Sequence, residues 1–65
     1  MQDYQKRILC EKEDLDDKLF RLTAFLCEGN CEREVGKAEF IRLHNQVVAM
    51  KRYSDVLGER IANFK

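Results

Sequence analysis

Apolar residues recur along both halves of the chain at spacings of three and four. In the first half the repeat carries Ile8, Leu15, Leu19, Leu22 and Leu26. In the second half it continues without a slip through Phe40, Leu43, Val47, Met50, Ser54, Leu57, Ile61 and Phe64. Alternating steps of three and four align side chains on one face of an α-helix, and a seven-residue repeat is typical of coiled coils. The pattern therefore predicts two long amphipathic helices, over about residues 2–28 and 37–64.

The segment between these helices carries the turn signals. Gly29-Asn30 is typical of a turn, and Gly29 suits the left-handed residue that often ends a helix. We expect a linker over about 29–36 and leave open whether residues 31–35 add a helical turn. A short link makes two long helices antiparallel neighbours. The sequence thus predicts an all-α fold with one domain over 1–65, a coiled-coil-like two-helix hairpin.

Antiparallel packing with a bend near residue 32 also predicts which residues face each other across the seam between the helices. The expected pairs are Leu22 with Leu43, Leu15 with Met50, Ile8 with Leu57 and Tyr4 with Ile61. Three polar residues interrupt this seam: Gln5, Lys12 and Ser54. Lys12 and Ser54 fall at nearly the same level, where a polar layer either fixes the register and the oligomeric state or contacts a ligand.

Further apolar residues lie beside or behind the seam: Leu9, Phe20, Ile41, Val48, Tyr53 and Val56. Two helices hide only one stripe each, and soluble monomers rarely expose a second apolar stripe of this size. We therefore expect the hairpins to pack side by side as a homo-oligomeric helical bundle.

Charge and cysteine content narrow the function classes. The 12 basic and 12 acidic residues give a formal net charge of +0, so the chain has no overall field for DNA, RNA or an anionic membrane surface. No apolar run approaches the roughly 20 residues of a membrane span. The odd number of cysteines favours reduced thiols in a cytoplasm. Cys27, Cys31 and His44 would supply three zinc ligands, but matched pairs are absent, so we expect neither metal nor cofactor.

Catalytic chemistry has few candidates. His44 is the only histidine, and the acidic run over 11–17 alternates with lysines as on a solvated helix face. Asp14 and Lys18 have the spacing of a stabilising helical ion pair. No nucleophile with a base and an orienting group is apparent, so we do not expect an enzyme. The antiparallel arrangement gathers basic residues at the open end of the hairpin: Lys6, Arg7, Arg60 and Lys65.

Two stretches resemble a family of very small, uncharacterised phage proteins related to a protein of a crAss-like phage. The first is Tyr4-Gln5-x-Arg7, followed by Glu11 and Leu15-Asp16-Asp17-Lys18. The second is Gln46-x3-Met50-x2-Tyr53-Ser54-x2-Leu57-x2-Arg60-Ile61-x2-Phe64. The similarity covers nearly the whole chain. The linker over 27–36 departs from it, and Gly36 stands where Pro is common in the family.

In size and architecture the chain is also similar to the anti-CBASS and anti-Thoeris sponges, small phage hairpins that oligomerise and sequester host immune nucleotide signals. This resemblance implies a counter-defence protein in the host bacterial cytoplasm. It would bind a cyclic oligonucleotide or an ADP-ribose derivative without cleaving it. The polar residues of the shared motif that packing does not require would bind the ligand: Arg7, Lys18, Gln46, Tyr53, Ser54 and Arg60. The alternatives are a phage accessory protein that docks an exposed helical face on a host protein, and a structural coiled-coil adaptor.

Overall fold

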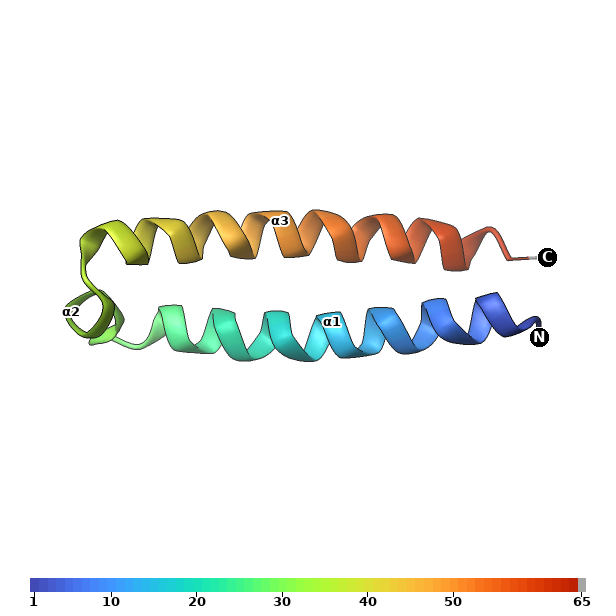
Figure 1. Ribbon diagram of the computed structural model, residues 1–65, viewed down its shortest axis with the longest axis horizontal. Helices are drawn as coiled ribbons and strands as arrows, with labels where there is room; N and C mark the ends of the chain where they lie inside the picture. Colours follow the sequence, from blue (N-terminus) through green and yellow to red (C-terminus); the bar gives the residue numbers. More distant parts are fainter. Residues whose placement is uncertain (65) are drawn as a thin grey trace.

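The computed structural model describes residues 1–64 and contains two long helices joined through a short one. Helix α1 spans Asp3–Cys27, α2 spans Cys31–Val35 and α3 spans Lys37–Ala62. Helices α1 and α3 run antiparallel, and the two termini lie at the same end (Figure 1). The molecule measures 47 × 14 × 13 Å. The prediction of an all-α hairpin is confirmed, and the open question about residues 31–35 is answered by the separate helix α2.

Helix α1 begins with a capping box formed by Gln2 and Gln5. Gln2 is the N-cap residue, and its backbone N–H donates to Gln5 Oε1 over 2.9 Å. This bond is the return half of a capping box, in which a side chain in the first turn satisfies a free backbone donor. It explains why Gln5 sits in the seam, because a buried polar side chain must find a hydrogen-bond partner.

The turn between α1 and α2 also differs from the sequence prediction. Glu28 ends α1 with an extended backbone, φ −68° and ψ 136°, and its N–H donates to the carbonyl of Phe25 over 3.1 Å. The prediction of a left-handed conformation at Gly29 was wrong, since Gly36 is the only glycine of residues 1–64 with positive φ.

Gly36 separates α2 from α3 with φ 86° and ψ 156°. Its N–H donates to the carbonyl of Glu32 over 2.8 Å, and its own carbonyl accepts from the N–H of Phe40 over 2.9 Å. Side chains strongly disfavour this backbone region, and proline fixes φ near −65°. The conformation therefore requires glycine here and excludes proline.

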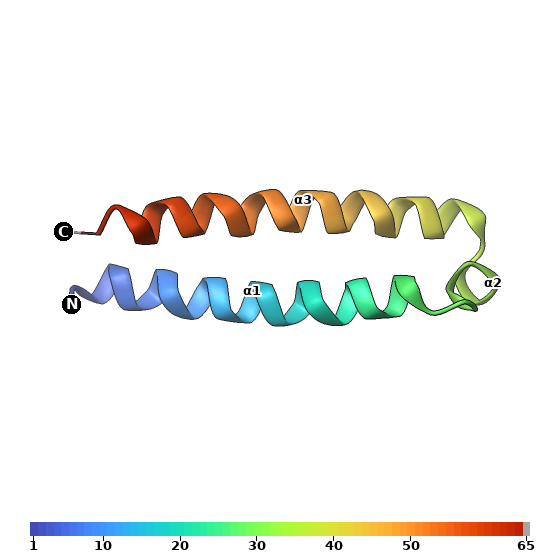
Figure 2. The ribbon, with the colours of Figure 1, turned by 180° about the vertical axis from the view of Figure 1, so that it is seen from behind.

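Helix α2 closes the loop end of the hairpin. The first turns of α3 extend past the end of α1, and α2 fills the space beneath them, as both views show (Figures 1 and 2). Cys31, at the start of α2, is completely buried. Burial raises the pKa of its thiol, and the nearby carboxylates of Glu34 and Glu28 raise it further.

The overhang of α3 shifts the register by about one helical turn from the predicted one. Tyr4 packs edge-to-face on Phe64, with ring centroids 6.1 Å apart, where the sequence predicted Ile61 opposite it. The prediction placed the bend at the middle of the linker. The structure places α2 at the end of α1, and this displaces α3 along the hairpin axis.

The apolar core is small. Among residues 1–64, the buried apolar residues are Ile8, Cys31 and Leu57. Most of the remaining seam positions are only half-buried. The residues expected beside the seam are all exposed, together with Met1 and Tyr4: Leu9, Phe20, Ile41, Val48, Tyr53 and Val56. The predicted surplus of exposed apolar side chains is thus confirmed for the single hairpin.

Candidate functional site

A polar layer crosses the seam near the middle of the hairpin. Lys12 Nζ donates to Ser54 Oγ over 2.8 Å and to Asp16 Oδ2 over 2.9 Å, and the Ser54 hydroxyl donates to Asp16 Oδ1. The hydrogen bond from Ser54 holds the pKa of Asp16 below its ordinary value, and the ammonium group of Lys12 lowers it further. The predicted meeting of Lys12 and Ser54 is confirmed.

Asp16 is the member of this layer that sequence reasoning missed, because it was assigned to the solvated acidic run. Its spacing of four from Lys12 was the available signal, since residues four apart share a helix face. With Asp16 present, the ammonium, the carboxylate and the hydroxyl satisfy one another across the seam. This closed geometry supports the interpretation in which the layer fixes the register.

The seam divides the rest of the surface into two flanks. Successive residues are turned by about 100° around the helix axis. In each helix, a residue directly before a seam residue therefore lies on one side of the seam, and a residue directly after a seam residue lies on the other. The flank that we call polar carries Tyr4, Arg7, Glu11, Asp14, Lys18, Arg21, Phe25, Glu39, Arg42, Gln46, Tyr53, Val56 and Arg60. The flank that we call apolar carries Lys6, Leu9, Glu13, Asp16, Phe20, Ile41, His44, Val48, Lys51 and Asp55.

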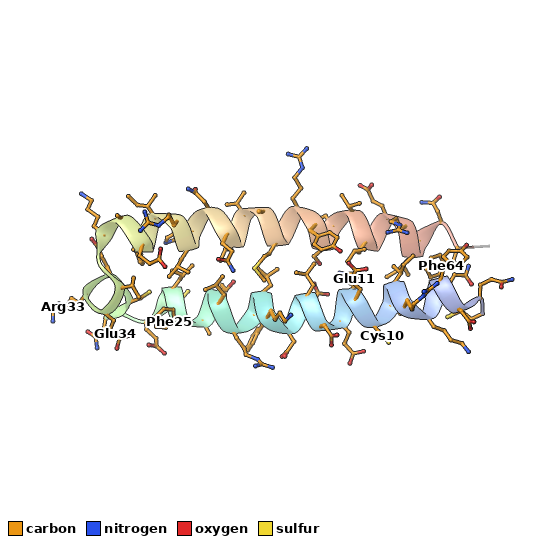
Figure 3. The ribbon with its side chains drawn as sticks, in the orientation of Figure 1. Cys10, Glu11, Phe25, Arg33, Glu34 and Phe64 are labelled. Atoms are coloured by element: carbon orange, nitrogen blue, oxygen red, sulfur yellow. The ribbon has the colours of Figure 1, made fainter. Side chains whose placement is uncertain are left out.

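Contacts in the structure agree with this division. A shallow groove of about 400 Å³ runs along the apolar flank, lined by Leu9, Lys12, Glu13, Asp16 and Ile61. In Figure 3, Glu11 lies on the side of α1 that faces α3, while Cys10 lies on the outer side of the helix.

Five of the six predicted ligand-binding residues share the polar flank. On α3, Gln46, Tyr53 and Arg60 follow one another at intervals of two turns, about 10 Å along the axis. On α1, Arg7 and Lys18 are three turns apart on the same flank. With the observed register, Arg7 lies level with Arg60, and Lys18 lies at a level between Gln46 and Tyr53. The hairpin therefore gathers residues from both ends of the sequence into one row.

The sixth residue, Ser54, lies apart from this row. It is buried in the seam, and its hydroxyl is engaged with Lys12 and Asp16 on the side of the apolar flank. Lys6, of the predicted basic cluster, shares the open end with Arg7 but lies on the other side of α1. Lys65, the last member of that cluster, lies outside the described residues.

Three cations of the polar flank have no carboxylate partner among residues 1–64. The ion pairs among residues 1–64 join Lys12 to Asp16, Arg21 to Asp17 and Arg42 to Glu39. Arg7, Lys18 and Arg60 make none with any described residue. The predicted pair of Asp14 with Lys18 was therefore wrong. In an exposed ion pair, the weak electrostatic attraction in water is largely offset by the side-chain entropy lost when two side chains are held in one geometry.

The other two residues of the row supply neutral contacts. Tyr53 is 45% exposed, so much of its ring is open to solvent. The amide of Gln46 is exposed and makes one weak contact, 3.7 Å from the sulfur of Met50. Guanidinium groups bind phosphate oxygens in pairs, aromatic rings stack on bases, and amides hydrogen-bond base edges. Together the row offers what an anionic nucleotide needs.

The side chains that could bind a metal ion are not gathered as the residues of the polar flank are. In the part of the chain that the structure describes, no group of three or more His, Cys, Asp and Glu side chains is placed to hold a metal ion. Cys31 is buried at the start of α2, whereas Cys27 is exposed at the end of α1.

None of the helices within residues 1–64 is both long and apolar enough to cross a bilayer.

The family comparison covers almost the whole hairpin. The sequence model of the Sequestin family matches residues 2–63, a range that includes all six predicted ligand-binding residues. No curated protein and no solved structure gives a significant match. The relation to a crAss-like phage protein stays a prediction. From the start of α1 to the end of α3, the chain therefore belongs to the Sequestin family, whose name refers to sequestration.

Proposed function

We propose that this protein sequesters a host immune nucleotide signal by binding it on the polar flank, without cleaving it. The observation that carries the proposal is the row of motif residues from both helices, whose cations Arg7, Lys18 and Arg60 have no carboxylate partner among residues 1–64. The family name supports sequestration, and the chemistry of the flank supports an anionic nucleotide. A cyclic oligonucleotide or an ADP-ribose derivative combines the phosphates and bases that this row can bind.

The proposed roles follow from position along the row. Arg7 and Arg60 lie level at the open end and bind phosphate, because paired guanidinium groups match its oxygens. Tyr53, about 10 Å away along α3, stacks on a base. Gln46 hydrogen-bonds a base edge, and Lys18 contributes charge between the two. Ser54 acts indirectly, by holding the two helices in register.

Sequestration places few demands on the protein beyond affinity and abundance. Each molecule must hold one signal long enough to lower its free concentration, so no reacting group is needed. A homo-oligomer would repeat the row around its symmetry axis and so raise the local density of positive charge. The proposal places this activity in the host cytoplasm during phage infection.

Titration calorimetry tests the proposal. We expect wild-type protein to bind at least one member of a panel of cyclic oligonucleotides and ADP-ribose derivatives, and the ligand to be recovered intact. Arg7→Ala and Arg60→Ala should each weaken binding by about 1.5–3 kcal/mol, the value of a hydrogen bond to a charged group. Folding should change by less than about 0.5 kcal/mol, as for most surface substitutions.

Arg33→Ala is the matched control, because Arg33 lies on α2 at the opposite end of the hairpin (Figure 3). It should leave affinity unchanged. Absence of heat with every nucleotide would overturn the proposal, whereas unchanged affinity in the Arg7 and Arg60 variants would overturn only the assignment of residues. Cleavage of the bound ligand would contradict sequestration.

The exposed apolar side chains support a second candidate, docking of the hairpin on a host protein. That candidate predicts no nucleotide binding and a dependence on the apolar flank alone.

A further inference from the structure

Tyr4 is an aromatic residue of the polar flank that lies outside the predicted ligand-binding set. Its ring packs edge-to-face on Phe64, with ring centroids 6.1 Å apart and ring planes at 80°. Phe64 lies at the open end of the hairpin, between the two helices (Figure 3). The contact uses only part of the tyrosine side chain, since Tyr4 is 51% exposed. The open end therefore presents a ring that is anchored by one contact and otherwise accessible.

The two arginines that we assign to phosphate lie close to this ring. Arg7 follows Tyr4 by three residues in α1, and residues at this spacing are neighbours on a helix surface, with Cβ atoms about 5–6 Å apart. Arg60 precedes Phe64, the residue that Tyr4 contacts, by four residues, which is about one helical turn. Tyr53 precedes Arg60 by seven residues, about 10 Å along the axis. Tyr4 is thus the nearer of the two tyrosines to the arginine pair along the hairpin.

The carboxylates of the polar flank favour the same end. Glu11 lies on the side of α1 that faces α3, at a level between Arg60 and Tyr53 in the observed register (Figure 3). Asp14 follows at the level of Tyr53. An anionic group that reached from the arginine pair toward Tyr53 would pass these carboxylates and be repelled by their like charge. On the described polar flank, no carboxylate lies between the arginine pair and Tyr4.

Two other carboxylates lie near the open end, those of Asp3 and Glu59. Each residue is two positions away from the nearest seam residue, so neither belongs to the polar flank. Neither forms an ion pair with any residue in the described part of the chain. The arginine pair therefore stays available to an anion beside the Tyr4 ring.

We infer, on the basis of the proposed function, that Tyr4, Arg7 and Arg60 form a subsite for a single nucleotide unit at the open end. The arginines hold its phosphate, and the tyrosine ring stacks on its base. One sugar joins the phosphate and the base of a nucleotide, so both reach this compact subsite together. Tyr53 then contacts a more distant part of the signal. The subsite is complete within one hairpin and does not require a second subunit.

A mononucleotide tests the subsite separately from the whole signal. The chain has two tyrosines, so their ring protons are readily compared in an NMR titration with adenosine monophosphate. The ring protons of Tyr4 should shift upfield, because a stacked base shields them, whereas those of Tyr53 should stay in place. The corresponding ribose phosphate is the matched ligand control, because it carries the phosphate without the base. It should cause no upfield shift at either ring.

Variants of Tyr4 test its part in binding the whole signal, measured by titration calorimetry. Tyr4→Leu should weaken the binding of a panel nucleotide at least about fivefold, as expected for the loss of one stacked base. Tyr4→Phe keeps the stacking ring and should stay within about twofold of the wild type. Phe25→Leu is the matched control, since Phe25 is an aromatic residue of the same flank at the other end of α1, and it should bind like the wild type (Figure 3). Circular dichroism of each variant separates a loss of stacking from fraying of α1.

The outcomes distinguish this subsite from the proposed function itself. A panel nucleotide that binds wild type and Tyr4→Leu equally would overturn the subsite and leave sequestration standing. Adenosine monophosphate that shifts the ring protons of Tyr53 in place of those of Tyr4, or shifts neither while a whole signal binds, would also overturn the subsite. Absence of binding by every nucleotide would overturn both.

Discussion

The two flanks of the hairpin share one seam, yet they differ in almost every other respect. The polar flank presents charges of both signs around the half-exposed Tyr4, Tyr53 and Val56, whereas the apolar flank presents the more exposed Phe20, Ile41 and Val48. The positions that carry these residues differ only in whether they precede or follow a seam residue. In a coiled-coil hairpin the seam therefore determines the fold, and the flanking positions determine what the fold can contact.

Both flanks keep their arrangement only while the seam holds the two helices together. Leu57 is the seam residue whose loss should matter most. Leu57 is 0% exposed in a core with few other buried side chains. Leu57→Ala should lower the free energy of unfolding by about 2–5 kcal/mol, because it removes buried methyl groups and leaves a cavity. Both flanks should be lost together, which thermal unfolding by circular dichroism would show as a large drop in melting temperature.

The neighbouring Val56 provides the control for this substitution. Val56 is 46% exposed and lies outside the seam. Val56→Ala should change stability by less than about 1 kcal/mol, since partly exposed apolar groups lose little burial. Equal effects at the two positions would contradict the observed register.

The register itself depends on the link at the loop end, where the next largest effect is expected. Gly36→Ala should destabilise the hairpin by about 1–3 kcal/mol, because alanine is strained at the positive φ found here. Gly29→Ala is the matched control. Gly29 has no positive φ, and no atom lies within 4 Å of an added Cβ. Chemical denaturation of both variants checks this, and a Gly36 variant as stable as the Gly29 variant would refute the strain.

Much of this architecture could be predicted from the sequence, because periodicity is a local property. Steps of three and four identified the helices and the residues left outside the seam. The register could not be predicted to within one turn, since it depends on how Cys31 packs α2 beneath α3. Asp16 was missed for a related reason, because its partner Ser54 comes from the other helix.

The candidate site shows the same limit. The motif supplied the residues Arg7, Lys18, Gln46, Tyr53 and Arg60, and helical spacing placed each set on one face of its own helix. Only the antiparallel packing of the two helices shows that the two faces coincide on a single flank. The internal use of the Ser54 hydroxyl could be established only from the geometry of the polar layer.

The smallest expected effect concerns this polar layer and the pH dependence of stability. Hydrogen bonds from Ser54, and then from Lys12, hold the pKa of Asp16 below its ordinary value of 3.8 in the folded hairpin. The unfolded chain therefore takes up a proton at Asp16 more readily than the folded chain does. The stability that Asp16 contributes is present above the unfolded pKa and is lost as the pH falls through the lowered, folded pKa.

Urea unfolding at several pH values between about 6 and 2 measures this dependence. Wild-type stability should decline on acidification, and Asp16→Asn should flatten the decline because the titrating group is gone. Asp14→Asn is the matched control, since the carboxylate of Asp14 makes no hydrogen bond or ion pair with any residue of the described chain. The stability of this variant should decline on acidification as that of the wild type does. If Asp16→Asn and Asp14→Asn showed the same dependence of unfolding free energy on pH, the polar layer would not contribute to the pH dependence of stability.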